Sequence, residues 1–254
     1  MSPSNPETAL VEKCTAFLNR YCREELGDFA QSYPREQTSL LISVCDVRAF
    51  DPTLADDLVE RPQQTRRHFE QALTEITLPV TLDLSDASVR MGDLPSSRQY
   101  HIDELRDQSV GELIALTGQV SNRTTVRVAP QTAAFNCQRC GTVSRIPQDT
   151  TDPDLQEPHE CQGCERQGPF VLDEERSTLR NVQVARLQLP PERSTGTATS
   201  VDVFLNGDAV DQLDGGDRVT ITGRHTLDDD QGVGFGHRLD GDRVRVEGAN
   251  FSAV

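Results

Sequence analysis

Two short motifs, Cys137-Gln-Arg-Cys140 and Cys161-Gln-Gly-Cys164, decide the fold of the middle of this chain. Twenty residues separate them, and this spacing is typical of a structural zinc site in which four thiolates complete a tetrahedral shell. Gly141 and Gly163 fit such a site, because its tight turns often need backbone angles that glycine adopts at low cost. Two disulfides or a redox-active CxxC pair are the alternatives.

The four thiols leave no open position for a catalytic water, so we expect a structural Zn²⁺ that folds a module and does no chemistry. His159 could replace one ligand, although a loop histidine is the simpler interpretation. The expected metal ligands are therefore Cys137, Cys140, Cys161 and Cys164, within a zinc ribbon over residues 135–172.

Strand-like runs lie on both sides of this ribbon. Two precede it, Leu113–Val120 and Thr124–Val128, and we expect Gly118 to break the first of them. The later runs are Leu179–Leu189, Thr199–Leu205, Arg218–Thr222 and Arg243–Glu247. About five strands with an inserted ribbon predict a Greek-key barrel of the OB type over residues 100–134 and 173–254.

The first hundred residues have a helical pattern. Apolar side chains recur every three or four positions over residues 7–32, which predicts one amphipathic helix that Pro34 ends. Residues 39–47 look like a strand, Asp51 with Pro52 predicts a helix start, and Pro62 opens a further helix that Pro79 stops. Residues 80–99 read as a connecting segment with one or two strands. We expect a helical domain with this connecting segment over residues 1–99, and an α+β multidomain fold for the chain.

The composition favours a cytoplasmic protein with no membrane partner. No apolar run reaches the roughly 18 residues that a membrane span needs, and the first residues lack a secretory pattern. Cys14, Cys22 and Cys45 lie in apolar patterns and are expected in the core, which indicates a reducing compartment.

The net charge is −16, and Lys13 is the only lysine. A surface rich in acids and almost free of lysine is typical of adaptation to high internal salt, as in a halophilic archaeon; a GC-rich genome with an acidic protein partner is the alternative. At molar salt the screening length is only about 3 Å, so the negative charge does not exclude nucleic-acid binding through close contacts.

Two stretches of this acidic chain, Leu113–Gln148 and Arg176–Pro191, contain no acid at all. They flank or enter the ribbon and carry seven arginines: Arg123, Arg127, Arg139, Arg145, Arg176, Arg180 and Arg186. A groove built there could hold phosphates. Pairing of these arginines with nearby carboxylates is the alternative.

Several stretches, taken in their order, resemble the N-terminal region of archaeal minichromosome maintenance (MCM) replicative helicases, particularly haloarchaeal ones. They are Ser39–Val44, Phe50–Ala55, Leu116–Pro130, Ala134–Gly141, Asn181–Gln188, Asp208–Asp211 and Gly216–Gly223. The resemblance implies a helical A domain, a zinc-binding domain and an OB domain, and rings, usually hexamers, that encircle DNA. By position, Arg123 and Arg127 match a basic strand that contacts single-stranded DNA, and Arg186 matches another basic position.

The chain also departs from the family pattern. It stops at Val254, where the family continues into an AAA+ ATPase, and with one lysine it has no GxxxxGK[ST] phosphate loop. The hairpin that is normally basic reads Thr226–His237 and includes Asp228, Asp229 and Asp230; Arg224 and Arg238 stand nearby. The loop after Gln188 lacks the Pro-Arg element that signals to the ATPase in the family.

These observations predict a DNA-replication protein that is not itself an enzyme. It would bind single-stranded DNA through Arg123, Arg127, Arg180, Arg186, Arg224 and Arg238, and would assemble as a homo-oligomer or with a full-length MCM helicase. The alternative is an assembly protein or degenerate helicase fragment that no longer binds DNA, which the acidic hairpin favours. The acidic runs Asp173–Glu175 and Asp228–Asp230 could chelate a cation, but solvated surface explains them more simply.

Overall fold

The computed structural model describes residues 6–77, 82–148, 155–193, 199–228 and 235–247. The chain forms two compact units. One contains Met1–Arg123 and Val184–Val254, and the other contains Thr124–Gln183. The first unit holds a helical block and a barrel, and the second holds the cysteine motifs. Among the described helices, none is both long and apolar enough to cross a membrane.

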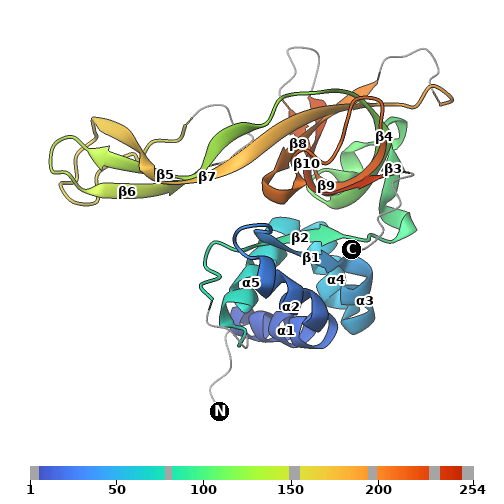
Figure 1. The fold of residues 1–254 in the computed structure, drawn as a ribbon, viewed down its shortest axis with the longest axis horizontal. Coiled ribbons are helices and arrows are strands. Elements are labelled where there is room, and N and C mark those ends of the chain that lie inside the picture. The colour runs from blue at the N-terminus through green and yellow to red at the C-terminus, as the bar shows by residue number, and fades with distance from the viewer. Residues whose placement is uncertain (1–5, 78–81, 149–154, 194–198, 229–234, 248–254) are drawn as a thin grey trace. The chain divides into compact units, whose positions relative to one another are not determined.

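Within the described residues, the helical block contains five helices (Figure 1). They pack around an aromatic cluster. Phe17 lies at the centre, with its ring centroid 5.3 Å from that of Tyr21 and 5.8 Å from that of Phe69. The single helix expected over residues 7–32 is in fact two helices, because the backbone leaves the helical conformation at Cys22. The helices are α1 (Pro6–Tyr21), α2 (Arg23–Ser32), α3 (Val44–Phe50), α4 (Pro52–Glu60) and α5 (Pro62–Glu75).

Local capping decides where the next elements begin. The strand expected over residues 39–47 ends early as β1 (Ser39–Ser43), because the Ser43 hydroxyl accepts from the Asp46 amide and starts α3. Asp51 caps α4 by accepting from the amides of Thr53 and Leu54, as expected. Helix α5 starts at Pro62, also as expected, and ends at Glu75. Pro79, the expected stop, lies outside the described residues.

The three cysteines of this block differ in their exposure to solvent. Cys14 and Cys22 are buried, as expected, and burial raises the pKa of each thiol to about 12. The prediction that Cys45 is a core residue was wrong, because it is exposed. In helix α3 the buried positions are Val44 and Val47, so the intervening Cys45 faces outward.

The barrel confirms the predicted OB-type topology. Strand β4 (Leu113–Arg123) pairs with β9 (Arg218–Asp228), and β9 pairs with β10 (Gly236–Val246). Strand β10 pairs with β8 (Ser200–Asn206), β8 pairs with β7 (Phe170–Gln188), and β7 returns to β4, which closes a five-stranded barrel. Gly118 does not interrupt β4. A Cβ at this position would lie 3.0 Å from Ile102 Cδ1, so glycine lets the strand pass close to the Ile102 side chain. A short strand, β3 (Gln99–His101), pairs with β4 outside the closed barrel. The connections contain short 3₁₀ turns: η1 (Ser96–Arg98), η2 (Ile102–Glu104), η3 (Asp107–Ser109) and η4 (Gly207–Ala209).

Strand β4 belongs to two hydrophobic cores at once. Leu113 and Ala115 pack into the core of the helical block, whereas Ile114 and Leu116 pack into the barrel. Successive side chains of a strand point to opposite faces, so this alternation is what the geometry requires. The run is apolar at every position because both of its faces are buried.

The second unit is a long antiparallel ribbon (Figure 1). Strand β5 (Arg127–Cys137) pairs with β6 (Val143–Pro147) on one side and with the first part of β7 on the other. The second sheet of the molecule is a separate parallel pair, β1 with β2 (Ser88–Gly92), in the helical block. Residues 80–99 thus contain β2 and the start of β3, which agrees with the one or two strands expected there.

Candidate metal centre and nucleic-acid interface

Cys137, Cys140, Cys161 and Cys164 converge at the end of the ribbon, and their sulfur atoms all lie within 4.8 Å of one another. Two sulfur pairs are separated by 3.8 Å and 3.5 Å. A zinc ion with Zn–S bonds of about 2.3 Å would separate its thiolates by about 3.8 Å, so the four sulfurs fit a tetrahedral shell. These cysteines can therefore hold a metal ion. Among the described residues, His159 is exposed and does not join the cluster.

Backbone hydrogen bonds shape each motif into a tight turn. The Gly141 amide donates to the Cys137 carbonyl at 2.9 Å, and the Glu165 amide donates to the Cys161 carbonyl at 2.8 Å. Gly141 has a φ of 75°, a conformation that glycine adopts without strain. A Cβ at Gly163 would lie 2.2 Å from Thr142 Oγ1, so only glycine fits between the two turns.

The local environment prepares these sulfurs for a cation. A hydrogen bond with Thr142 lowers the pKa of Cys140 to about 6, which favours the thiolate near neutral pH. Desolvation and the neighbouring sulfurs raise the pKa of Cys164 to about 12. A thiolate at Cys164 is thus disfavoured unless a cation balances the charge, and a divalent metal ion supplies that charge.

On the barrel, the arginines expected to bind DNA are held by carboxylates. Arg123 contacts Asp211 at 3.1 Å and Asp214 at 2.7 Å. Arg186 forms a two-pronged contact with Asp202, with N–O distances of 2.6 Å and 2.7 Å. Pairing with nearby acids, the alternative to phosphate binding, therefore describes both side chains.

The two arginines of the β9–β10 hairpin are also engaged. Arg224 contacts Asp240, its cross-strand neighbour, at 2.8 Å. Arg238 lies 3.4 Å from Asp240, and its guanidinium lies 4.8 Å from the ring centroid of Phe204. Asp228 ends strand β9; Asp229 and Asp230 of the expected acidic hairpin lie outside the described residues.

On the ribbon, Arg127 and Arg180 lie on one face. Arg127 is opposite Val182, and Ala129 is opposite Arg180, so the two arginines are diagonal neighbours on paired strands. Arg127 is exposed, and no carboxylate within the described part of the chain forms an ion pair with it. The arrangement places two arginines on the same face of the ribbon, and the exposed Arg127 can contact an anion there.

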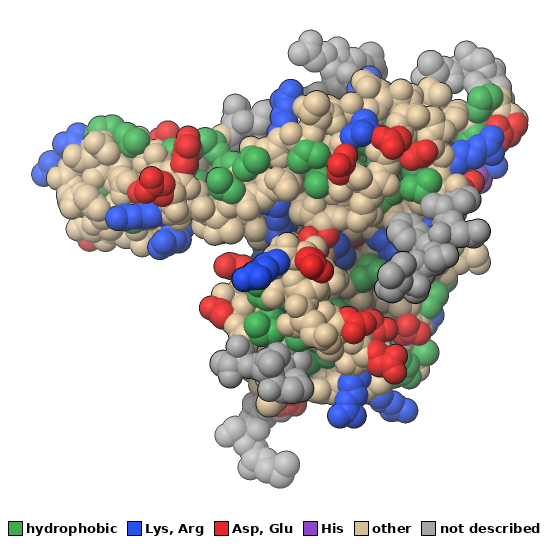
Figure 2. Space-filling model, in the orientation of Figure 1, with side chains coloured by type: hydrophobic (Ala, Val, Ile, Leu, Met, Phe, Trp, Pro, Cys, Tyr) green, Lys and Arg blue, Asp and Glu red, His purple; other side chains and the backbone are tan. Residues whose placement is uncertain are grey.

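The visible surface agrees with this pattern of paired charges. Figure 2 shows basic and acidic side chains interspersed on each unit, and no continuous basic stripe is seen among the described residues on this face. The two acid-free stretches of the sequence, Leu113–Gln148 and Arg176–Pro191, therefore do not correspond to one broad basic surface on this face.

Family models match both the helical block and the part of the chain that carries the cysteines and most of these arginines. A model of the MCM N-terminal domain matches residues 12–110, and a model of the MCM OB domain matches residues 101–227. The chain belongs to the MCM family. The MCM OB match includes the four cysteines and the arginines from Arg123 to Arg224, and the helical block corresponds to the MCM N-terminal match.

Relatives and a solved structure agree with this assignment. DNA replication licensing factor mcm4 of Xenopus tropicalis is 28% identical over 183 residues, which are 70% of this chain and 21% of that protein. DNA replication licensing factor Mcm2 of Drosophila melanogaster is 25% identical over 256 residues, 91% of this chain and 28% of that protein. The chain thus spans between about a fifth and about a quarter of these relatives' length.

The crystal structure of the N-terminal domain of an archaeal MCM has a similar fold, with a TM-score of 0.79 and 24% sequence identity. The match covers 95% of this chain and 99% of the other. At 24% sequence identity, this similarity establishes a shared fold and nothing more.

Other polar residues of this MCM chain were not singled out by the sequence. His225 is buried and hydrogen-bonded to His237, with 2.9 Å between Nε2 and Nδ1. Arg90 is buried between the helical block and the barrel. Neither lies in a motif, and the only sequence signal is a charged or titratable residue within an apolar strand pattern.

Proposed function

We propose that this MCM chain binds single-stranded DNA and assembles with copies of itself or with a full-length MCM helicase. The observation that carries the proposal is the pair Arg127 and Arg180 on one face of the ribbon, within stretches that contain no acid. The relatives are named as DNA replication factors, which supports DNA as the ligand. The 254 residues contain no phosphate loop, so the proposal concerns binding and not ATP hydrolysis.

Phosphate groups would contact the ribbon through charge-assisted hydrogen bonds from the guanidinium groups. On the barrel, Arg123 and Arg186 would contact phosphates only if these displaced Asp211, Asp214 and Asp202. Both arginines are partly exposed, so each ion pair is a weak interaction that a strand could replace at small cost. Binding would then be modest in affinity and strongly dependent on salt.

Fluorescence anisotropy of a labelled oligo(dT) strand, measured between roughly 0.2 M and 1 M KCl, tests DNA binding where screening differs. We expect Arg127→Glu with Arg180→Glu to weaken binding at least about tenfold, and to reduce the salt slope by about 0.7 for each phosphate that the variant no longer binds. Arg23→Glu with Arg35→Glu, two charge reversals at exposed positions of the helical block, is the control. Absence of binding at all salt concentrations, or equal weakening by the control, would exclude the DNA-binding proposal.

We also propose that the four cysteines hold a structural zinc ion. Cys137, Cys140, Cys161 and Cys164 supply a complete thiolate shell, so the ion would order the end of the ribbon and would offer no site for substrate. A chelator should remove one equivalent of zinc and abolish the amide protection of the ribbon end, while that of the barrel is kept. The zinc proposal would be contradicted if the protein purified without any bound metal and the ribbon stayed ordered in the presence of a chelator.

An assembly role without DNA is the second candidate. The pairing of Arg123, Arg186 and Arg224 with carboxylates favours it, because such pairs leave less charge for phosphates. Light scattering, alone and with a full-length MCM helicase, distinguishes the two roles. Oligomers that form without detectable DNA binding would support the assembly role.

A further inference from the structure

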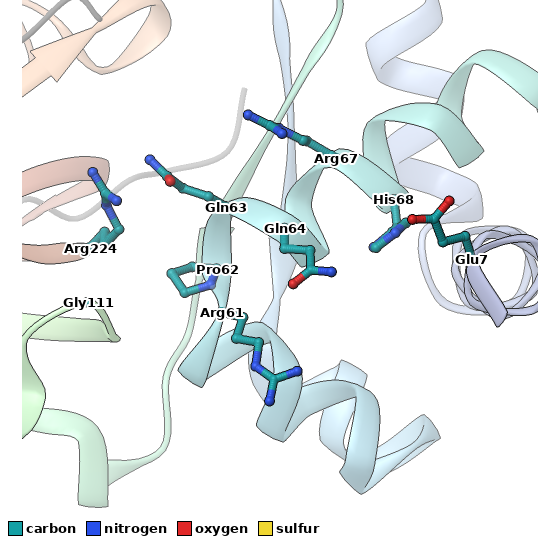
Figure 3. Close-up of a pocket in the computed structure, with 9 residues that line it drawn as sticks. All are labelled: Glu7, Arg61, Pro62, Gln63, Gln64, Arg67, His68, Gly111 and Arg224. Atoms are coloured by element: carbon teal, nitrogen blue, oxygen red, sulfur yellow. The ribbon is translucent and has the colours of Figure 1, made fainter.

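A hollow of about 530 Å³ lies between the start of helix α5 and the barrel (Figure 3). Residues of α5, together with Arg61 just before it and Glu7 of α1, form one wall, and Gly111 and Arg224 form the other. All of them belong to the first compact unit. None of the lining residues belongs to the ribbon, so the hollow does not depend on the DNA site proposed above.

The charge of this hollow is opposite to that of the chain. Arg61, Arg67 and Arg224 line it, whereas Glu7 is the only carboxylate among the described lining residues. Arg61 and Arg67 are exposed, and within the described residues neither forms an ion pair. In a chain of net charge −16 this is an unusual local excess of positive charge.

The side chains of one helical face point into the gap. Gln63 and Arg67 lie one turn apart on α5, and Figure 3 shows both extending toward the side where Arg224 lies. Arg61 points away in the same view, so it contributes charge at the edge. Arg66, next to Arg67, pairs with the buried Asp242 of the barrel. That contact holds α5 against the barrel beside the hollow.

The start of helix α5 adds two backbone donors. No side chain caps this end, and Pro62 has no amide hydrogen. The amides of Gln63 and Gln64 are therefore the donors that the first turn offers, at the positive end of the helix dipole. An anion in the hollow would meet amide, carboxamide and guanidinium donors together.

We propose that this hollow binds phosphate groups through Gln63, Arg67 and Arg224, with the first turn of α5 as an additional donor. Arg67 supplies a guanidinium that no described carboxylate neutralises, and Arg224 shares its charge with Asp240. The volume is within the range of small-ligand sites, and suits a nucleotide-sized group. The phosphate could belong to a nucleic-acid strand or to a free nucleotide; both present the same chemistry.

The test titrates sodium pyrophosphate, dTMP and oligo(dT) separately into ¹⁵N-labelled chain and follows the amide signals of Gln63, Gln64 and Gly111. We expect pyrophosphate to shift these signals, and Arg67→Gln to raise its Kd about tenfold through loss of a charge-assisted hydrogen bond. Arg23→Gln, which removes the same charge from an exposed position on α2, should leave the Kd unchanged.

Two further arms identify the source of the phosphate. Shifts with oligo(dT) but not with dTMP would assign the site to a strand, and the reverse would assign it to a nucleotide. Arg127→Glu with Arg180→Glu should leave the pyrophosphate shifts intact, which separates this site from the ribbon. Unshifted amides with all three probes, or an equal rise of the Kd in Arg23→Gln, would overturn the proposal.

Discussion

Arg123 illustrates how neighbouring acids change the role of a basic residue. Its guanidinium contacts Asp211 and Asp214, which follow it by about ninety residues in the chain and are both exposed. The side chain of Arg123 is itself 32% exposed, so solvent screens both contacts. The acids would compete with phosphate for the same guanidinium group.

Neutralising these acids should therefore strengthen DNA binding. We expect Asp211→Asn with Asp214→Asn to lower the Kd for oligo(dT) several-fold, because the change frees Arg123 and removes two repulsive charges. Asp211 has a φ of 59°, which asparagine tolerates well, so the fold should be kept. Anisotropy titrations at matched salt provide the measurement. Adding Arg123→Gln should cancel the gain; a gain that persists would show that only net charge matters.

At the scale of elements, the β9–β10 hairpin contains a histidine pair in which His225 is buried and His237 is half-buried. His225 Nδ1 is 2.9 Å from Ser109 Oγ, and its Nε2 is 2.9 Å from His237 Nδ1. Burial, and then the neighbouring His237, lower the pKa of His225 below its usual 6.5. Protonation of His225 is thus disfavoured in the folded hairpin.

This pair predicts an acid-sensitive hairpin. The unfolded chain binds a proton at pH 6.5 more readily than the folded chain, so the contribution of His225 is present above pH 6.5 and is lost as pH falls below it. One such proton changes the free energy of unfolding by at most about 1.4 kcal/mol per pH unit. Urea denaturation between pH 7.5 and pH 5 measures the slope. His237→Gln should flatten it and His159→Gln, at an exposed site, should not; equal slopes in all three proteins would contradict the assignment.

At the scale of the whole first unit, a buried polar seam joins the helical block to the barrel. Arg90 donates to Ser39 Oγ at 2.8 Å and to the Asp242 carbonyl at 2.9 Å. Asp208 accepts from the amides of Thr38 and Ser39 at 3.0 Å and 2.8 Å. Burial alone would raise the pKa of Asp208, but hydrogen bonds from Ser39 and Thr38 hold it below its usual value. Strand β4 crosses the same boundary with apolar side chains.

Removing the cation of this seam should destabilise the unit strongly. Arg90→Met leaves buried acceptors without a donor, and the loss of one partner from a buried charged network costs about 3–5 kcal/mol. Urea denaturation followed by circular dichroism measures the loss. Arg23→Met, at an exposed position, should change stability by less than about 0.5 kcal/mol. A decrease below about 1 kcal/mol for Arg90→Met would show that the seam contributes little.

Much of this architecture could be predicted from local patterns. The spacing of Cys137, Cys140, Cys161 and Cys164 predicts a cluster, because each pair forms within one turn. Asp51 and Pro62 mark helix starts through contacts with residues two or three positions away. Strand runs predict the barrel for the same reason: alternation of side chains is a local property of the backbone.

The tertiary structure alone decided which charges are available. Arg123 and Asp214 are 91 residues apart, and Arg66 and Asp242 are 176 residues apart, so no local pattern reports these pairs. The sequence by itself determined the family, the barrel and the convergence of the cysteines, since these depend on short-range spacing and on the order of apolar runs. Folding brought together the arginines and acids, placed Arg67 beside the barrel and buried His225. Each of these depends on contacts that close only when distant strands and helices pack.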